Sequence, residues 1–216
     1  MDVIGSDEAK AIERDIAAVE AATGAEIVAA IVPRADDYPE AQWRAFSLAA
    51  ALAALVVWAV DVGRPDWVTP AALLAQALAI LAAGALAAIA ARYVPACRRL
   101  FVREGRMRGE VRQCAEVMFL SRELFATPHR DAVLILVAEL ERVVVIVPDV
   151  AYRGRVSAAE WQRIVERMTP QLAAGSLRES FGAGLAALQA LLVAKGFAPE
   201  DGASHLPDRL VRGEAP

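Results

Sequence analysis

Two long apolar runs dominate the pattern of hydrophobic and polar positions. The first covers Trp43–Val62 and the second covers Val68–Ala91, with charged residues only near the ends of the first. A helix needs about 20 apolar residues to cross roughly 30 Å of hydrocarbon at about 1.5 Å per residue. The pattern therefore predicts a transmembrane helical hairpin over residues 43–91, with helices 43–62 and 68–91. A buried hairpin inside a soluble helical protein is the less favoured interpretation, since a chain of this length offers little other surface to enclose it.

Outside the hairpin, shorter patterns predict alternating helices and strands. A first helix begins with Ser6 as its N-cap and ends at Gly24. The sequence SAAE at Ser157–Glu160 matches a capping box and opens a later helix. Apolar runs predict three buried strands, and the short ELER segment between the last two predicts a hairpin. The strands are Glu26–Val32, Ala132–Ala138 and Val143–Val147, and the other helices cover the regions around Val111–Phe125 and Phe181–Leu192.

The first strand determines the domain organisation. It has no close partner before residue 132, so we expect it to pair with the later strands across the inserted hairpin. Residues 1–42 and 92–197 then form one split α/β (α+β) domain, residues 43–91 form the hairpin, and residues 198–216 form a polar tail.

Composition agrees with a membrane protein. The hydrophobic fraction is 57% and the mean hydropathy is +0.38, against roughly 45–50% apolar residues in soluble domains. The net charge of −4 gives no case for nucleic-acid binding. The two cysteines, Cys97 and Cys114, have no metal-ligand or redox spacing, and we expect both to be buried free thiols in a reducing compartment.

Basic residues predict the orientation of the hairpin. Arg64 is the only one in the connector Asp61–Trp67, whereas nine arginines flank the other side of the hairpin: Arg34, Arg44, Arg92, Arg98, Arg99, Arg103, Arg106, Arg108 and Arg112. The first 25 residues are charged throughout and show no signal-peptide pattern. The positive-inside rule therefore predicts a two-pass protein of the inner (plasma) membrane, with both termini cytoplasmic and the connector outside.

Small residues repeat every four positions in both apolar runs, which is typical of packed membrane helices. The repeat predicts a packing face between membrane helices, and in an alanine-rich segment such a repeat also arises by chance. Its members are Ala45, Ala49 and Ala53 in the first run and Ala71, Ala75, Ala79, Ala83, Ala87 and Ala91 in the second.

Several stretches resemble a known family. The segments GAEIVAAIVPRADDYPEAQWR, HRDAVLILVAELERVVVIVPD, EWQRIVERM and GSLRESFGAGLAAL are similar to the small bacterial membrane branch of the TPM-domain family. The resemblance implies a three-to-four-stranded sheet flanked by helices, in a family with both phosphatases and accessory or repair factors. Where the family usually has Gly before the second strand's Val-Leu, this chain has Ala132, which disfavours a positive φ there.

Enzyme signatures such as GxxxxGK[ST], GxGxxG, HExxH and GxSxG do not occur in the sequence. If the first and third strands run parallel, polar residues from three loops meet at one rim of the sheet. These residues are Asp36, Asp37, His129, Arg130, Asp131 and Asp149. Asp36, Asp37 and Asp149 are then candidate ligands for Ca²⁺ or Mg²⁺, and Arg130 a candidate phosphate contact. Each also has an ordinary interpretation as a turn or capping residue.

Three hypotheses of function follow. The favoured one is a non-catalytic accessory or assembly module that acts at the membrane on another membrane protein or on itself. The alternative is a divalent-metal-dependent, phosphatase-like hydrolase that uses the rim acids. The third is a lipid-surface sensor that binds anionic headgroups through the stretch Arg92–Arg112, at about 1 kcal/mol for each basic residue near the surface. Its headgroup-facing residues are Arg92, Arg98, Arg99 and Arg103. In all three the lipid bilayer is a partner.

Overall fold

The computed structural model describes residues 5–64, 69–199 and 210–212. The chain divides into two compact units, Met1–Asp36 with Met107–Pro216, called here the sheet unit, and Asp37–Arg106, the hairpin unit. Part of the predicted connector (residues 65–68) and most of the polar tail (200–209 and 213–216) lie outside the described residues.

The sheet unit holds four strands in the order β3-β2-β1-β4. They are β1 (Glu26–Val32), β2 (Ala132–Ala138), β3 (Val143–Pro148) and the two-residue β4 (Val211–Arg212). β1 pairs parallel with β2 and with β4, and β2 pairs antiparallel with β3. The expected pairing of the first strand with the later ones is confirmed, as are the hairpin and the small mixed sheet.

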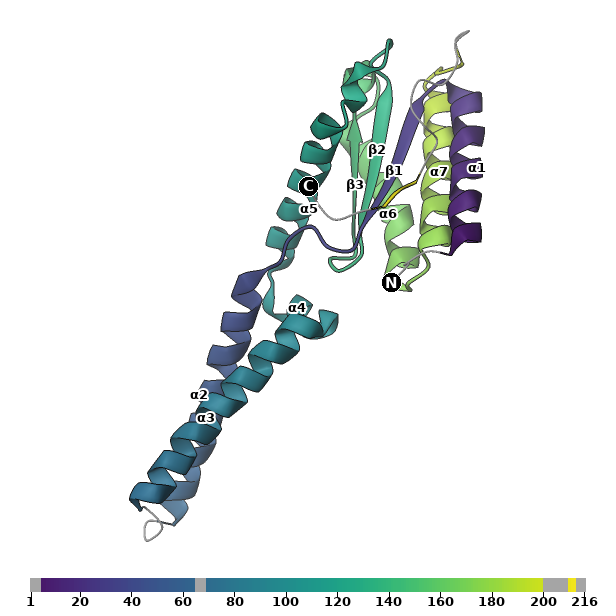
Figure 1. The fold of residues 1–216 in the computed structure, drawn as a ribbon. Coiled ribbons are helices and arrows are strands. Elements are labelled where there is room, and N and C mark those ends of the chain that lie inside the picture. The colour runs from purple at the N-terminus through teal and green to yellow at the C-terminus, as the bar shows by residue number, and fades with distance from the viewer. Residues whose placement is uncertain (1–4, 65–68, 200–209, 213–216) are drawn as a thin grey trace. The chain divides into compact units, whose positions relative to one another are not determined.

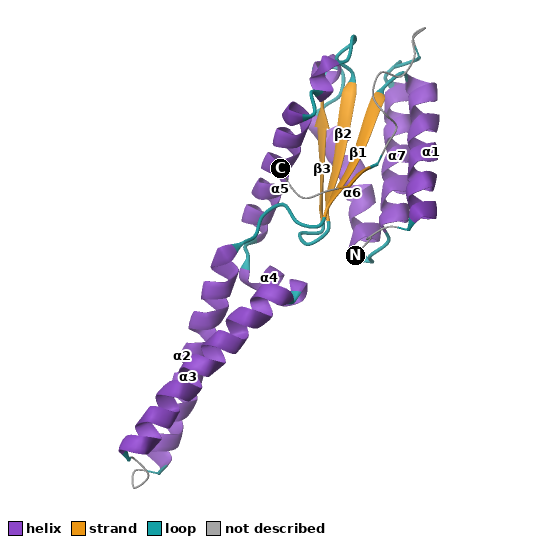
Figure 2. Ribbon diagram, viewed as in Figure 1, coloured by secondary structure: helices purple, strands orange, loops and turns teal. Residues whose placement is uncertain are grey.

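Helices cover both faces of this sheet (Figure 2). α1 (Ser6–Thr23), α6 (Ala158–Ala173) and α7 (Leu177–Ala194) contribute to one apolar cluster, and α5 (Glu104–Ser121) contributes to the other. Successive side chains of a strand point to opposite faces, so Ile27, Ala29 and Ile31 lie in the first cluster while Val28 and Ala30 lie in the second. This explains why β1 and β2 are apolar at nearly every position and entirely buried.

Helix ends in the sheet unit largely follow their predicted signals. α1 ends at Gly24, which adopts the left-handed conformation at φ 70° and donates its N–H to the Glu20 carbonyl. The capping box at Ser157 and Glu160 is present at the start of α6. The prediction for Ser6 is wrong, because Gly5 is the N-cap residue of α1 and no side chain caps it. α1 and α7 lie side by side (Figure 1), joined by an ion pair between Asp15 and Arg178.

The hairpin unit contains α2 (Pro39–Gly63), α3 (Pro70–Tyr93) and the short α4 (Pro95–Phe101). Gly84 of α3 is buried, and a Cβ there would lie 2.7 Å from the ring of Phe46 on α2. Near the other end, Gln76 donates to Asp61 at 2.8 Å. The absent side chain of Gly84 thus lets the Phe46 ring pack directly on the α3 backbone.

The small-residue stripe is only partly right. In α2, Ala45 is buried and Ala49 and Ala53 are half-buried, as expected. In α3, Ala71, Ala75 and Ala79 are exposed, whereas the less exposed residues there are Ala72, Gln76, Ile80, Ala83, Gly84, Ala87, Ala88, Ala90 and Ala91. A strict spacing of four drifts around a helix of 3.6 residues per turn. The contact face therefore includes a step of three, from Ile80 to Ala83, among its steps of four.

Candidate functional site

The predicted rim does not form, because β1 runs parallel to β2 and hence opposite to β3. The six candidate residues are divided between opposite ends of the sheet. One end, where β1 and β2 begin and β3 finishes, is called here the Asp149 end. The other, where β1 and β2 finish and β3 begins, is called the Glu141 end. Apolar alternation is the same for both strand directions, which is why the pattern alone did not exclude the wrong arrangement.

At the Asp149 end, Arg130 and Asp149 form a bidentate ion pair. The Arg130 Nε and Nη2 atoms donate to the two carboxylate oxygens at 2.8 and 2.9 Å. The Asp149 side chain is 3% exposed and also accepts from the N–H of Val150 at 2.7 Å. The hydrogen bond to Asp149 raises the pKa of Arg130. Planar, two-pronged pairs of this kind fix geometry as well as charge, so Asp149 locks the end of β3 to the turn before β2.

That turn places Arg130 in the left-handed region at φ 55°, one residue before Asp131. Ala132 stands where the family usually has glycine and was expected not to adopt a positive φ. The positive φ of this turn lies at Arg130 instead. The carbonyl of Asp131 accepts from the hydroxyl of Tyr152 at 2.7 Å. Burial, followed by the nearby Asp131 carboxylate, raises the pKa of Tyr152. Oδ1 of Asp131 is buried and has no hydrogen-bond partner within the described part of the chain.

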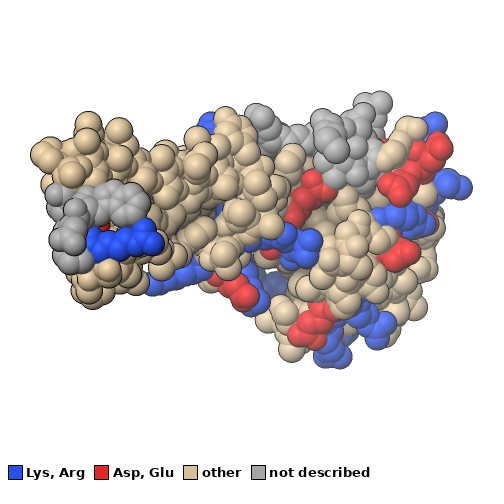
Figure 3. All heavy atoms as spheres, turned by 90° about the horizontal axis from the view of Figure 1, so that it is seen from below, with Lys and Arg blue, Asp and Glu red and all other residues tan. Residues whose placement is uncertain are grey.

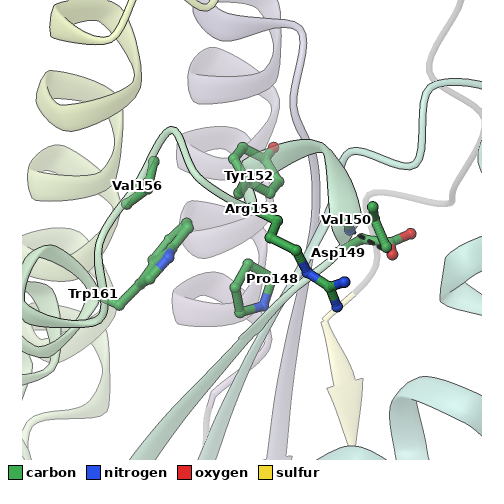
Figure 4. Close-up of a pocket in the computed structure, with 7 residues that line it drawn as sticks. All are labelled: Pro148, Asp149, Val150, Tyr152, Arg153, Val156 and Trp161. Carbon is green, nitrogen blue, oxygen red and sulfur yellow. Dashed lines mark hydrogen bonds between the residues drawn. The ribbon is translucent and has the colours of Figure 1, made fainter.

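A pocket of about 320 Å³ adjoins this cluster. Its lining is formed by Pro148, Asp149, Val150, Tyr152, Arg153, Val156 and Trp161 (Figure 4). The rings of Tyr152 and Trp161 meet edge to face with centroids 5.6 Å apart. Trp161, Tyr152 and Arg153 were not among the predicted site residues. The partner of the Tyr152 hydroxyl is the Asp131 carbonyl, 21 residues earlier in the chain, so the local sequence around Tyr152 did not indicate it.

At the Glu141 end, the chain leaving β1 is held by a carboxylate. Oε1 of Glu141 accepts from the N–H of Ala35 at 2.9 Å, and Glu141 is buried. Asp36 follows directly and is half-buried, while Asp37, the first residue of the hairpin unit, is exposed. Glu141 belongs to the ELER turn between β2 and β3 and is buried there, whereas the neighbouring Arg142 is exposed.

The metal prediction loses its geometric basis, because Asp36 and Asp37 follow β1 at the Glu141 end and Asp149 lies at the other. Among the described residues, no group of three or more His, Cys, Asp or Glu side chains could hold a metal ion. His129 is exposed in the turn before β2. The two cysteines are free; Cys114 is buried, whereas Cys97 is only half-buried, so the expectation holds fully for one of them. Burial, followed by the charge of Glu141, raises the pKa of Cys114.

The basic residues next to α3 have different environments. Arg92, Arg99 and Arg103 are exposed or half-buried, but Arg98 is 9% exposed. Its guanidinium donates to the carbonyls of Ala91 and Arg92 in the last turn of α3. A cation there satisfies carbonyls left unpaired at a helix C-terminus. The prediction that Arg98 faces headgroups is therefore wrong, and this residue caps α3.

Three described helices are long and apolar enough to cross a membrane: α2, α3 and α7. The first two are the predicted hairpin, and 6% of the apolar window of each is buried. α7 was not predicted as a span, and it buries Phe181, Leu185, Leu188 and Leu192 in the core of the sheet unit. On one face of the molecule, Lys, Arg, Asp and Glu gather over the sheet unit and are sparse over the hairpin (Figure 3). These features are compatible with a membrane protein.

Comparisons with known proteins identify the fold. The TPM domain family model matches residues 102–191. The solved structure of the BA42 protein from the psychrophilic bacterium Bizionia argentinensis is similar, with a TM-score of 0.59 at 16% identity, over 97% of this chain and 95% of that chain. No curated protein matches. The likeness to BA42 concerns the fold alone at this identity. The expected resemblance to the TPM-domain family is thereby confirmed over residues 102–191, and the membrane branch of that family stays a prediction.

Proposed function

We propose that the chain is a two-pass inner-membrane protein whose cytoplasmic TPM domain is a non-catalytic accessory or assembly module for another membrane protein or for a second copy of itself. The sheet unit is the domain predicted over residues 1–42 and 92–197, and the helices near 43–62 and 68–91 hold it at the bilayer. The coarse part of this proposal, an apolar hairpin joined to a TPM domain, rests on the geometry above. The accessory role goes further.

The observation that carries the accessory role is the state of Asp149. This residue is the most buried carboxylate of the candidate set, and both of its oxygens are engaged by Arg130 while Oδ1 also accepts from Val150. A carboxylate that acts as a metal ligand or general base needs a lone pair directed at its target. Asp149 instead joins two segments of the fold. Its contacts support a structural role at this end of the sheet.

Copurification tests the proposal. The full chain carrying an affinity tag is extracted from its native membrane in mild detergent, and the recovered proteins are identified by mass spectrometry against an untagged strain. We expect one membrane protein, or a higher oligomer of this chain, to be enriched in stoichiometric amounts. Recovery of a lone monomer under every detergent and salt condition would contradict the proposal.

The orientation is tested separately by labelling. A cysteine is introduced at Val62 in a Cys97→Ser/Cys114→Ala background, and intact cells are treated with a membrane-impermeant maleimide. We expect Val62→Cys to react in intact cells, and a control Gln162→Cys on α6 to react only after lysis. The opposite preference would show that the domain faces outward. Val62 and Gln162 are both exposed, so accessibility of the side chain does not limit either reaction.

One observation favours the alternative function, a phosphatase-like hydrolase. Asp131 Oδ1 is buried without a hydrogen-bond partner in the described residues, beside Tyr152. Such an oxygen is available to a cation such as Mg²⁺ or Ca²⁺. If the chain hydrolyses a phosphate ester such as p-nitrophenyl phosphate, Asp131→Asn should abolish turnover without lowering the thermal midpoint by more than a few degrees. Wild-type protein that is inactive with every divalent cation would remove this alternative.

A further inference from the structure

The outer edge of β3 combines features of a strand-pairing site. β3 is the last strand in the order β3-β2-β1-β4, and no described strand pairs with its other side. The N–H of Asp149 donates to the Ala132 carbonyl at 2.9 Å, which fixes the alternation of the antiparallel ladder. Val143, Val145 and Val147 direct their backbone polar groups to β2. Val144 and Ile146 direct theirs outward.

This edge lacks the usual protection of edge strands. Native proteins blunt such edges with charged side chains, prolines or bulges. β3 reads VVVIVP, without a charge, and its only proline is the last residue. Five of its six residues are half-buried and Val144 is buried. A long apolar strand with open N–H and C=O groups is a template for another extended chain.

The pocket described above continues this edge. Residues directly opposite each other in an antiparallel pair share a face of the sheet. Ile146 and Trp161 pack on the same apolar cluster, on the face that carries α6. A side chain of an incoming strand opposite Pro148 would therefore lie on the face where Pro148, Val156 and Trp161 form the pocket. Figure 4 shows Arg153 extended beside Pro148.

Charge at the two ends of β3 indicates the kind of occupant. Arg142 precedes the strand and Arg153 follows it, and both are exposed. Neither guanidinium has an ion pair or hydrogen bond within residues 5–64, 69–199 and 210–212. An antiparallel pair of two β3 strands would bring Arg142 of one copy toward Arg153 of the other, and like charges would oppose it. A segment with acidic residues at both ends would be attracted instead.

We propose that β3 docks an extended segment of a partner protein, apolar at its centre and bracketed by two acidic residues. The segment adds a strand to the sheet through Val144 and Ile146, places one apolar side chain in the Trp161 pocket and pairs its acids with Arg142 and Arg153. The six residues of β3, at about 3.4 Å each, span roughly 20 Å between the two ends of the strand. This inference rests on the proposed accessory function and names the chemistry of its partner.

A defined peptide tests the inference. Full-length protein in nanodiscs is titrated into fluorescein-labelled Glu-Val-Thr-Val-Thr-Val-Thr-Glu, and anisotropy is recorded. We expect saturable binding that Arg153→Glu weakens by about three- to tenfold, as for loss and reversal of one exposed ion pair. The control is Arg167→Glu, at an exposed arginine of α6 that does not line the pocket, and it should leave the affinity unchanged. The double variant Arg142→Glu/Arg153→Glu should bind the same peptide better when lysine replaces both glutamates.

Two further measurements isolate the backbone contribution. Ile146→Pro removes an outward N–H without removing a bond to β2, and should reduce binding at least as much as Arg153→Glu. Because that variant could also disturb packing, a peptide N-methylated at alternate residues is titrated against the wild type. Binding of the methylated peptide with full affinity, or no binding of either peptide, would overturn the inference.

Light scattering tests whether the edge of β3 is occupied by a second copy of this chain. If the wild type is a dimer that Ile146→Pro converts to a monomer, the edge belongs to a second copy and the partner proposed here is wrong. Failure of the peptide experiments alongside successful copurification would overturn this inference alone. Failure of copurification would count against the accessory function itself.

Discussion

α3 and α7 are both long, apolar helices, yet the structure treats them differently. Mean hydropathy is 2.2 in the most apolar window of α3 and 1.2 in that of α7, but 6% of the first and 39% of the second is buried inside the protein. α3 directs Leu78, Leu81, Leu86 and Ile89 outward, whereas α7 directs a stripe of leucines into a cluster with α1, α6 and the sheet. Composition thus indicates which helices are apolar enough to lie in lipid. Packing determines which of these helices are instead buried against other parts of the protein.

The largest effect we expect comes from testing that difference directly. Leu188 of α7 is fully buried, and Leu188→Ala should destabilise the sheet unit by about 2–5 kcal/mol, the usual cost of a large-to-small change in a packed core. Leu81 of α3 is 55% exposed, and Leu81→Ala should change stability by less than about 1 kcal/mol. Unfolding of both variants is followed by circular dichroism in detergent. Equal destabilisation would show that the two helices have similar surroundings.

The same comparison shows what the sequence could and could not predict. The hairpin followed from composition, because helices of a soluble domain do not need apolar runs of about 20 residues or more. The helices around Val111–Phe125 and Phe181–Leu192 and the capping box at Ser157–Glu160 also followed from local patterns, and Val111 and Leu188 are buried in the core. These features depend on local patterns, which a single sequence displays.

The candidate site failed because it depended on a non-local choice. β2 and β3 are joined by a short turn and must run antiparallel, but the direction of β1 is not set by its own residues. The long connection from β1 to β2 passes through α5, which covers one face of the sheet. Such a connection is typical of parallel neighbours. That argument was available from the order of elements and would have separated Asp36 from Asp149.

The second prediction concerns packing inside the hairpin. A leucine at Gly84 would meet the ring of Phe46, which lies 2.7 Å from the position of a Cβ. Gly84→Leu should therefore cost about 1–3 kcal/mol of hairpin stability, as overpacking usually does. Ala85→Leu adds the same side chain on an exposed face and is the matched control. Thermal aggregation in detergent would measure both, and an equal shift would show that Phe46 moves aside freely.

The third prediction tests the end of α3. Arg98 is buried against the last carbonyls of the helix, whereas Arg99 is half-buried and has no such contact in the described residues. Arg98→Ala should lower stability by about 1 kcal/mol, in the range of cations at a helix C-terminus, and should increase hydrogen exchange of amides in α4. Arg99→Ala should instead weaken binding to vesicles containing anionic lipid. Identical behaviour of the two variants would contradict a capping role.

The smallest expected effect concerns an ion pair within the sheet unit. Glu160, in the first turn of α6, accepts from Lys195 at 2.8 Å and from Ser157. These contacts, the lysine first, lower the pKa of Glu160 to about 2, against an ordinary value of 4.5. A carboxyl whose pKa is lowered by folding stabilises the native state above the unfolded pKa, and this contribution is lost as the pH falls from about 4.5 to about 2. Thermal midpoints measured across that interval should fall more steeply for the wild type than for Glu160→Gln. Parallel curves would show that the ion pair does not persist in solution, as is common for pairs in contact with water.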